Sequence, residues 1–354
     1  MSAPARDRRA VRGRVVRTGF VSFRFAERAV VVGLALLAAL VGLSLVTMTS
    51  GDFELTVSEV VRSLIGHGDG ASDFIVLTLR LPRLVTGVLV GAALAVSGGI
   101  LQSLSGNPLA SPDIIGFTQG AATGAILVIV LVDGSMVQVG AGALVGGVAT
   151  AVVVYLLAFK RGVQGFRLIL IGIGVSFIML SLNKYLITRA SLTDAIAAQA
   201  WQVGGLNGRG WDHVQVVGVA VAVLLPLALY FGRRLALMEM GDATAKGLGV
   251  DSERTRLVLI AISVGLAAVA TAAAGPVSFL ALAAPQLARR LTGSAGAGLV
   301  PTALMGALLL VAGDFAVQRL FSPAQLPVGI ATGALGGLYL VWLLAHEWRR
   351  GIAR

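Results

Sequence analysis

Long apolar blocks alternate with short polar segments from residue 29 almost to the end of this chain. About 20 residues of helix, at a rise of 1.5 Å per residue, are enough to cross the hydrocarbon of a bilayer. The pattern therefore predicts an all-α polytopic membrane protein with about ten transmembrane helices, two of them short. The expected spans are 29–48, 84–104, 114–132 (short), 137–159, 168–188, 213–231, 257–274, 277–291 (short), 299–319 and 327–345.

The composition agrees with this class and limits the chemistry. The chain is 56% hydrophobic and 13% charged, and its mean hydropathy of +0.89 is typical of a membrane protein. Without cysteine there can be no disulfide or thiolate metal site, and the three scattered histidines do not suggest a metal cluster. No Gly-x-x-x-x-Gly-Lys-Ser/Thr loop is present, so we do not expect this chain to hydrolyse ATP.

Basic residues predict the orientation. With the N-terminus inside, most Lys and Arg fall in cytoplasmic segments, which the positive-inside rule favours, and both termini are then cytoplasmic. The opposite side holds only Arg62, Arg80, Arg83, Lys184, Arg189, Arg209 and Arg319. The expected division is a basic cytoplasmic tail at 1–28 rather than a signal peptide, a single transmembrane domain at 29–348, and a cytoplasmic C-terminus at 349–354. Because the tail directly precedes a span, lipid headgroups are its expected partner rather than nucleic acid.

Within the spans, two kinds of residue are informative. Glycine recurs at a spacing of four, which lets helices pack closely in lipid, at Gly87/Gly91, Gly120/Gly124, Gly142/Gly146 and Gly333/Gly337. Asp314 is the one acidic residue clearly inside a predicted span. A charge at the bilayer centre costs roughly 2.5–3.5 kcal/mol, so Asp314 should face protein or water, and a proton relay is one interpretation.

The longest cytoplasmic loop, 233–256, has the pattern of a short helical pair joined at Gly241. It is polar enough to lie outside the bilayer and yet keeps an apolar stripe. Docking of a cytoplasmic partner would explain the stripe, and so would a loop that folds onto its own helix ends. The stripe comprises Leu235, Leu237, Met238, Ala243, Ala245, Leu248 and Val250.

A series of motifs, in order, resembles the permease subunits of vitamin B12 and ferric-siderophore ABC importers, which have ten membrane helices and the type II importer fold. The resemblance covers nearly everything from Arg80 to the C-terminus. The motifs are Arg80-Leu81-Pro82-Arg83, Gly91-Ala92-Ala93-Leu94 with Ser97-Gly98 and Gln102, Asn107-Pro108-Leu109-Ala110 with Pro112 and Gly116, Gly241-Asp242 to Leu248-Gly249, Gly275-Pro276 to Phe279 with Pro285 and Arg289-Arg290, Gly306-Ala307-Leu308-Leu309 with Asp314, and Leu326-Pro327-Val328-Gly329.

The resemblance implies three sets of site residues. The 233–256 loop would be the coupling segment that contacts the ATP-binding subunit, through Gly241, Asp242, Ala245, Leu248 and Gly249. The cytoplasmic gate would comprise Asn107 and Leu109, together with Gln164, Gly165 and Phe166 before the fifth span. Docking of the substrate-binding protein would use Arg80, Arg83 and Arg319.

Each set also has a simpler interpretation or a departure from the family. Arginines beside a span also anchor to headgroups, and Asn107-Pro108 is also a helix stop. The third family arginine is replaced by Gln318, and Arg319 lies one residue later, about 100° around a helix. The family's Pro-His and Glu-Leu-Pro are here Pro285-Gln286 and Gln325-Leu326-Pro327.

These departures and four further motifs make the chain resemble one of the two permease subunits of ferric-enterobactin importers. The motifs are Phe166-Arg167-Leu168-Ile169, Leu237-Met238-Glu239-Met240-Gly241-Asp242, Gln325-Leu326-Pro327-Val328-Gly329 and Gly336-Gly337-Leu338-Tyr339-Leu340. The resemblance implies an inner-membrane subunit that passes an enterobactin-like ferric siderophore to the cytoplasm without bond chemistry, a catalytic residue, a metal or a cofactor of its own. A second, different permease chain, two ATP-binding subunits that use ATP and Mg²⁺, and an extracytoplasmic binding protein would be its partners. Cobalamin or haem transport by the same fold is the alternative, and an ion-coupled secondary transporter is the alternative from another class.

Overall fold

Helices occupy most of the described chain, which comprises residues 14–18, 21–25, 27–159, 165–294, 296, 298–322 and 326–352 of the computed structural model. A hairpin of two antiparallel strands, β1 and β2, lies within the basic tail. The elements are β1 (Arg14–Thr18), β2 (Val21–Phe25), α1 (Glu27–Thr49), α2 (Val57–Leu64), α3 (Gly70–Asp73), the π-helical η1 (Phe74–Arg80), α4 (Leu81–Ser105), α5 (Phe117–Val132), α6 (Met136–Ala158), α7 (Gly165–Arg189), α8 (Leu192–Val203), α9 (Trp211–Met238), α10 (Asp242–Gly247), α11 (Ser252–Ala274), α12 (Leu280–Thr292), α13 (Leu299–Leu320) and α14 (Val328–Ile352).

Every predicted span coincides with a helix, but not every helix can cross a bilayer by its own length. Within the described residues, seven helices are long and apolar enough, and α5 and the described apolar part of α14 are shorter. The 13-residue α12 is shorter again, because residues 275–278 before it are not helical. The predicted all-helical membrane fold is therefore observed, with seven helices that meet the length and composition expected of a span.

Short helices that the sequence interpretation missed lie between the longer ones. The first is α2, which begins with a capping box in which Thr56 and Glu59 satisfy each other's backbone N–H groups. The backbone N–H and hydroxyl of Thr56 both donate to Glu59 and hold the pKa of its carboxyl below the usual range. The Thr-x-x-Glu spacing of Thr56 and Glu59 could have predicted this helix start. Helix α8 likewise begins at a Ser191 cap.

The second predicted span begins earlier than expected. Helix α3, η1 and α4 form one continuous helix from Gly70 to Ser105, so Arg80 and Arg83 lie within it and not just outside it. The sequence interpretation had placed the start of this span at residue 84, where the uninterrupted apolar block begins after the arginine pair. The π-helical turns of η1 carry the helix past this point, with the N–H of Leu81 bonded to the carbonyl of Val76, five residues back.

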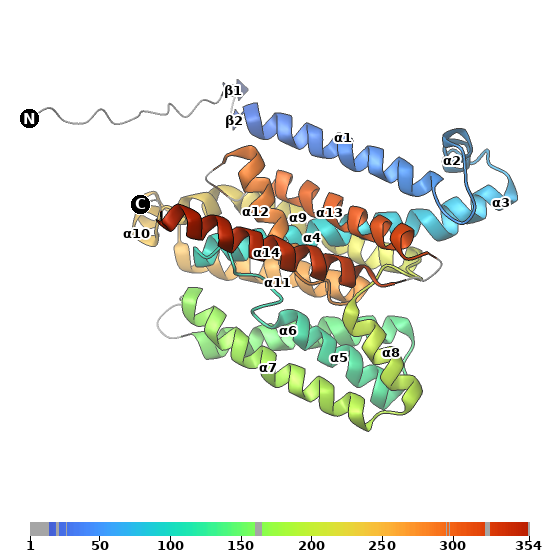
Figure 1. The fold of residues 1–354 in the computed structure, drawn as a ribbon. Coiled ribbons are helices and arrows are strands. Elements are labelled where there is room, and N and C mark those ends of the chain that lie inside the picture. The colour runs from blue at the N-terminus through green and yellow to red at the C-terminus, as the bar shows by residue number, and fades with distance from the viewer. Residues whose placement is uncertain are drawn as a thin grey trace, which may run out of the picture.

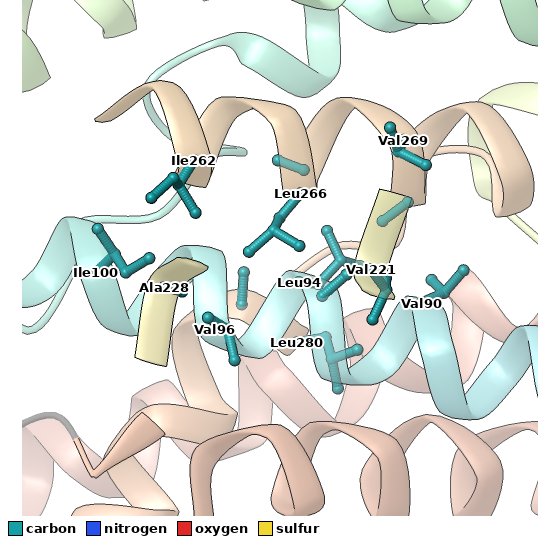
Figure 2. Close-up of a cluster of buried hydrophobic side chains, with 14 of the residues drawn as sticks. Val90, Leu94, Val96, Ile100, Val221, Ala228, Ile262, Leu266, Val269 and Leu280 are labelled. Carbon is teal, nitrogen blue, oxygen red and sulfur yellow. The ribbon is translucent and has the colours of Figure 1, made fainter. Parts of the chain in front are cut away.

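Helix α4 is the centre of the upper group of helices in Figure 1, where it packs against α9, α11, α12 and α13. Figure 2 shows Leu94 and Ile100 of α4 among side chains of α9 and α11. Ser97 and Ser263 are both buried and bond to each other's hydroxyl and carbonyl groups where α4 crosses α11. Helices α5 to α8 form the lower group in Figure 1.

The glycine spacing has two different outcomes. Gly91 packs against the backbone of Gly306, and Gly124 and Gly146 bring α5 and α6 into backbone contact, as the spacing predicts. A Cβ at Gly333 or Gly337, by contrast, would meet nothing within 4 Å. Among the described residues, these two glycines of α14 therefore do not pack against another helix.

Candidate coupling, gate and docking sites

The predicted coupling segment is the short helix α10 and its two flanking turns. Gly241 before it and Gly249 after it have φ values of 100° and 82°, in the region that favours glycine. These two residues, Asp242 and Leu248 are exposed, and Leu248 is 58% exposed despite its apolar side chain. Met240 at the preceding turn is 62% exposed and is a further surface residue that the motif comparison missed.

The structure corrects the prediction for Ala245. This residue is completely buried and packs in the main core cluster with Leu235, Met238 and Val250, so it cannot contact another subunit. Its role is to hold α10 on its own chain. One side of the apolar stripe thus folds inward onto its own chain, whereas Leu248 points outward, where docking of a partner stays a prediction.

The surface position of Leu248 gives a test of docking. We expect Leu248→Asp to weaken assembly with the ATP-binding subunit by roughly tenfold or more, since it would place a charge in an apolar contact. The fold of the isolated chain should be unaffected, because the side chain is exposed. Co-purification of the ATP-binding subunit measures the effect, with Leu248→Met as the matched control. Normal assembly of the Asp variant would show that α10 is not the docking element.

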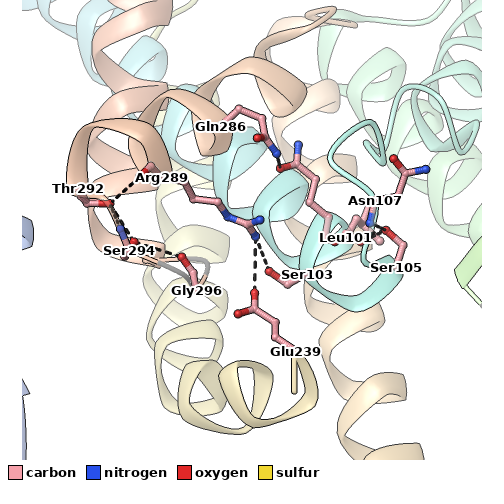
Figure 3. Close-up of polar contacts among 11 residues, drawn as sticks. Leu101, Ser103, Ser105, Asn107, Glu239, Gln286, Arg289, Thr292, Ser294 and Gly296 are labelled. Carbon is pink, nitrogen blue, oxygen red and sulfur yellow. Dashed lines mark hydrogen bonds and ion pairs between the residues drawn. The ribbon is translucent and has the colours of Figure 1, made fainter. Parts of the chain in front are cut away.

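Two ion pairs connect the coupling segment to neighbouring helices. Arg256 of α11 donates to both carboxylate oxygens of Asp242, at 2.8 and 3.0 Å. Arg289 of α12 lies 3.6 Å from the carboxylate of Glu239 and also donates to the hydroxyl of Ser103 at 2.7 Å (Figure 3). The segment is therefore held to the bundle on two sides.

The predicted gate turn follows α4 directly. Gly106 ends the helix with a φ of 61°, and the side chain of Asn107 accepts the N–H of Leu109 at 2.9 Å, which fixes the turn. Leu109 is exposed. The other predicted gate segment is only partly visible: Gln164 lies outside the described residues, and Gly165 and Phe166 begin α7 without described side chains.

Sequence reasoning did not find a carboxylate behind this turn. Asp113 accepts the backbone N–H of Phe279 at 3.0 Å, just before α12, across 166 positions of sequence. Phe279 has a φ of 64°, which is rare for a residue with a side chain, and its side chain packs against Gly336 of α14. The segment that follows the gate turn is thus hydrogen-bonded, through Asp113, to the residue that precedes α12.

The three predicted docking arginines lie around one cavity of about 300 Å³ at the other end of α4. Arg83 forms a two-pronged pair with Asp314, with both nitrogen to oxygen distances at 2.8 Å, and Gln318 donates to the same carboxylate at 2.7 Å. Arg80 donates to the carbonyls of Met48 and Phe53. The contact with Arg83 supplies Asp314 with the basic partner that its sequence neighbourhood lacked, and a structural ion pair accounts for the buried charge.

Arg319 differs from the other two arginines. It is exposed, and its guanidinium lies 5.9 Å from the centre of the Phe315 ring. The one-residue shift therefore leaves it on the same cavity as Arg80 and Arg83. Gln318, which stands where the family has an arginine, carries no charge. Its side-chain amide donates a hydrogen bond to Asp314 instead.

Comparison with known proteins identifies the family. The model of the FecCD transport family matches residues 36–346. The ferric enterobactin transport system permease protein FepG of Escherichia coli K12 is 44% identical over 325 residues, which are 92% of this chain and 98% of that protein. The Fe(3+)-citrate import system permease protein YfmE of Bacillus subtilis is 35% identical over 92% of this chain and 98% of its own length.

A solved structure agrees with these relatives. An inward-facing metal-chelate type ABC transporter superposes with a TM-score of 0.80 at 28% identity, over 89% of this chain and 99% of that chain. The resemblance seen in the motifs is thereby confirmed across the predicted permease domain. This chain belongs to the FecCD transport family.

Proposed function

We propose that this chain is the permease subunit of an ABC importer that moves a ferric siderophore of the enterobactin class into the cytoplasm. The observation that carries the proposal is the 44% identity to a ferric enterobactin permease over nearly the full length of both chains. The structure supports it with an exposed coupling segment at one end of α4 and an arginine-lined cavity at the other. ATP hydrolysis by a separate subunit would shift the population between outward-open and inward-open states.

Uptake of radioactive iron from ferric enterobactin tests this function directly. We expect a strain that lacks the gene to lose uptake and to regain it with the intact chain. Ferric citrate, labelled cobalamin and labelled haem should be measured alongside, because a relative named for citrate import is also similar. Loss of cobalamin or haem uptake with iron intact would replace the cargo. Transport by the purified chain in liposomes without an ATPase would replace the class.

We infer further that α5, α12 and α14 complete ten crossings with the seven longer helices. The short length of α12 is compatible with this because the non-helical residues 275–277 before it are buried or partly buried within the protein, although Ser278 is exposed. Both termini are then cytoplasmic. Reporter fusions at Arg233 and Arg350 should report the same side, and opposite sides would overturn this topology.

A second permease chain is the proposed partner of α14. The helix exposes Leu335 and Leu338, and its Gly333 and Gly337 have free space beside them. Small residues without a packing neighbour in the described part of their own chain suit close approach of another helix better than they suit lipid. A different homologous chain is expected, as in enterobactin importers.

Docking of the binding protein should depend on Arg319 in particular, since Arg80 and Arg83 already have partners in this chain. We expect Arg319→Glu to lower the affinity for the binding protein by roughly tenfold, with a loss that shrinks at high salt. Arg189→Glu is the matched control, because Arg189 lies over Tyr185 in a similar way but not on the cavity. Equal effects of the two variants would mean that the cavity is not the docking site.

A further inference from the structure

Arg289 lies at the meeting point of α12, α4 and the end of α9. Helix α4 leads to the predicted gate turn, and α9 leads to the predicted coupling segment. Arg289 projects from α12, and a single terminal nitrogen of its guanidinium reaches both Ser103 of α4, at 2.7 Å, and Glu239 at the end of α9, at 3.6 Å. Figure 3 shows the three side chains converging from their separate helices. The side chains of Arg289 and Glu239 are only 22% and 20% exposed.

On one side, Arg289 is connected to the coupling segment. Glu239 is the C-cap of α9 and stands two residues before Gly241, where α10 begins. No other element separates the carboxylate from the exposed turn. A displacement of α10 by a bound ATP-binding subunit must therefore move the backbone that carries Glu239.

On the other side, Arg289 is connected to the gate turn. Ser103 is two residues before Ser105, whose hydroxyl accepts the backbone N–H of Asn107 at 3.3 Å. One turn earlier on α12, Gln286 donates to Gln102 at 2.7 Å. These two contacts make the end of α4 follow α12, and the gate turn is the direct continuation of α4.

The contacts of Arg289 do more than hold α12 against α4. The pair of Gln286 and Gln102 already joins these helices without a charge, so a mostly buried ion pair would be a costly addition for that purpose alone. The two contacts of Arg289 also differ in length. The bond to Ser103 is short, whereas the contact to Glu239 is longer than a hydrogen bond and can tighten or open with little loss.

We propose that Arg289 is the positioning residue that transmits displacement of the coupling segment, through Glu239, to Ser103 and the gate turn. The proposal rests on the proposed function as an ATP-driven permease. It assigns to Arg289 no contact with the cargo and none with the ATP-binding subunit. Its effect is on the ratio between ATP hydrolysed and cargo moved.

The test uses the complete transporter reconstituted in liposomes, with Arg289→Gln and Glu239→Gln in this chain. We expect both variants to assemble and hydrolyse ATP, while ferric enterobactin moved per ATP falls by roughly tenfold or more. Arg28→Gln is the matched control, because the hydrogen bonds of Arg28 go to the carbonyls of Leu291 and Arg290 at the same end of α12 and not to α10 or α4. The control should keep the normal ratio.

A second readout follows the gate itself. Because the chain has no cysteine, Leu109→Cys gives a single labelling site on this subunit. Its reaction rate with a maleimide should change on addition of ATP and vanadate in the otherwise unaltered transporter. In the Arg289→Gln background the rate should no longer respond, which a merely structural role would not produce.

The outcomes separate this inference from the function on which it rests. An unaltered transporter that moves no iron chelate with ATP would refute the proposed function. Normal transport per ATP and normal labelling response in both variants would overturn the role of Arg289. If Arg289→Gln does not assemble, Glu239→Gln decides alone, since its amide keeps the size of the side chain at a helix end.

Discussion

Alanine in place of Gly98 should destabilise the protein strongly. A Cβ at this position would overlap the backbone carbonyl of Ala281 at the start of α12. A backbone group cannot rotate away as a side chain can, and α4 cannot shift without straining the Ser97 bonds to Ser263. We expect a loss at or above the upper end of the roughly 1–3 kcal/mol that overpacking usually costs.

The neighbouring glycine provides the control. A Cβ at Gly99 would meet Thr302 and Pro285 side chains at 3.5 and 3.6 Å, which is ordinary contact. Gly99→Ala should be neutral or up to about 1 kcal/mol stabilising, because alanine favours a helix over glycine. Reversible unfolding in detergent compares the two variants. Similar stability of Gly98→Ala and Gly99→Ala would mean that α4 and α12 are not in backbone contact.

The sequence could predict the helices and the family because both depend on local patterns. Apolar length places each span, and motifs such as Asn107-Pro108-Leu109 retain their turn chemistry wherever the turn lies. Helix starts were less predictable. The second span was expected to begin at residue 84, but the π-helical turns of η1 join the same helix before Arg83, and no simple periodicity reveals such turns.

The contacts within the sites could not be predicted, because they join distant positions. Arg83 and Asp314 are 231 residues apart, and Arg289 and Ser103 are 186 apart. The side of α10 that faces inward depends on packing against α9 and α11, so the sequence alone could not separate buried Ala245 from exposed Leu248. Family motifs indicate which residues belong to a site. Only the fold shows which of these residues already have a hydrogen-bond or ion-pair partner within the chain.

Removal of Arg83 is the second large effect that we expect. Its two bonds neutralise Asp314, whose side chain is only 10% exposed, and Arg83→Ala would leave that carboxylate with Gln318 alone. Breaking a buried pair from one side typically costs about 3–5 kcal/mol, because the remaining charge is stranded. Unfolding in detergent should show a loss of this order for Arg83→Ala, and the binding-protein affinity of the surviving folded fraction should change little.

The double variant decides between an internal pair and a docking residue. If Arg83 mainly neutralises Asp314, then Arg83→Met combined with Asp314→Leu should recover most of the stability, since an apolar pair of similar volume can replace a buried ion pair. If the guanidinium of Arg83 instead pairs with a carboxylate of the binding protein, Arg83→Ala should leave the free energy of unfolding unchanged. It should then reduce the affinity for the binding protein, and the reduction should be larger at low salt. The bidentate geometry with Asp314 favours the first result, which would leave the exposed Arg319 as the proposed docking residue at this cavity.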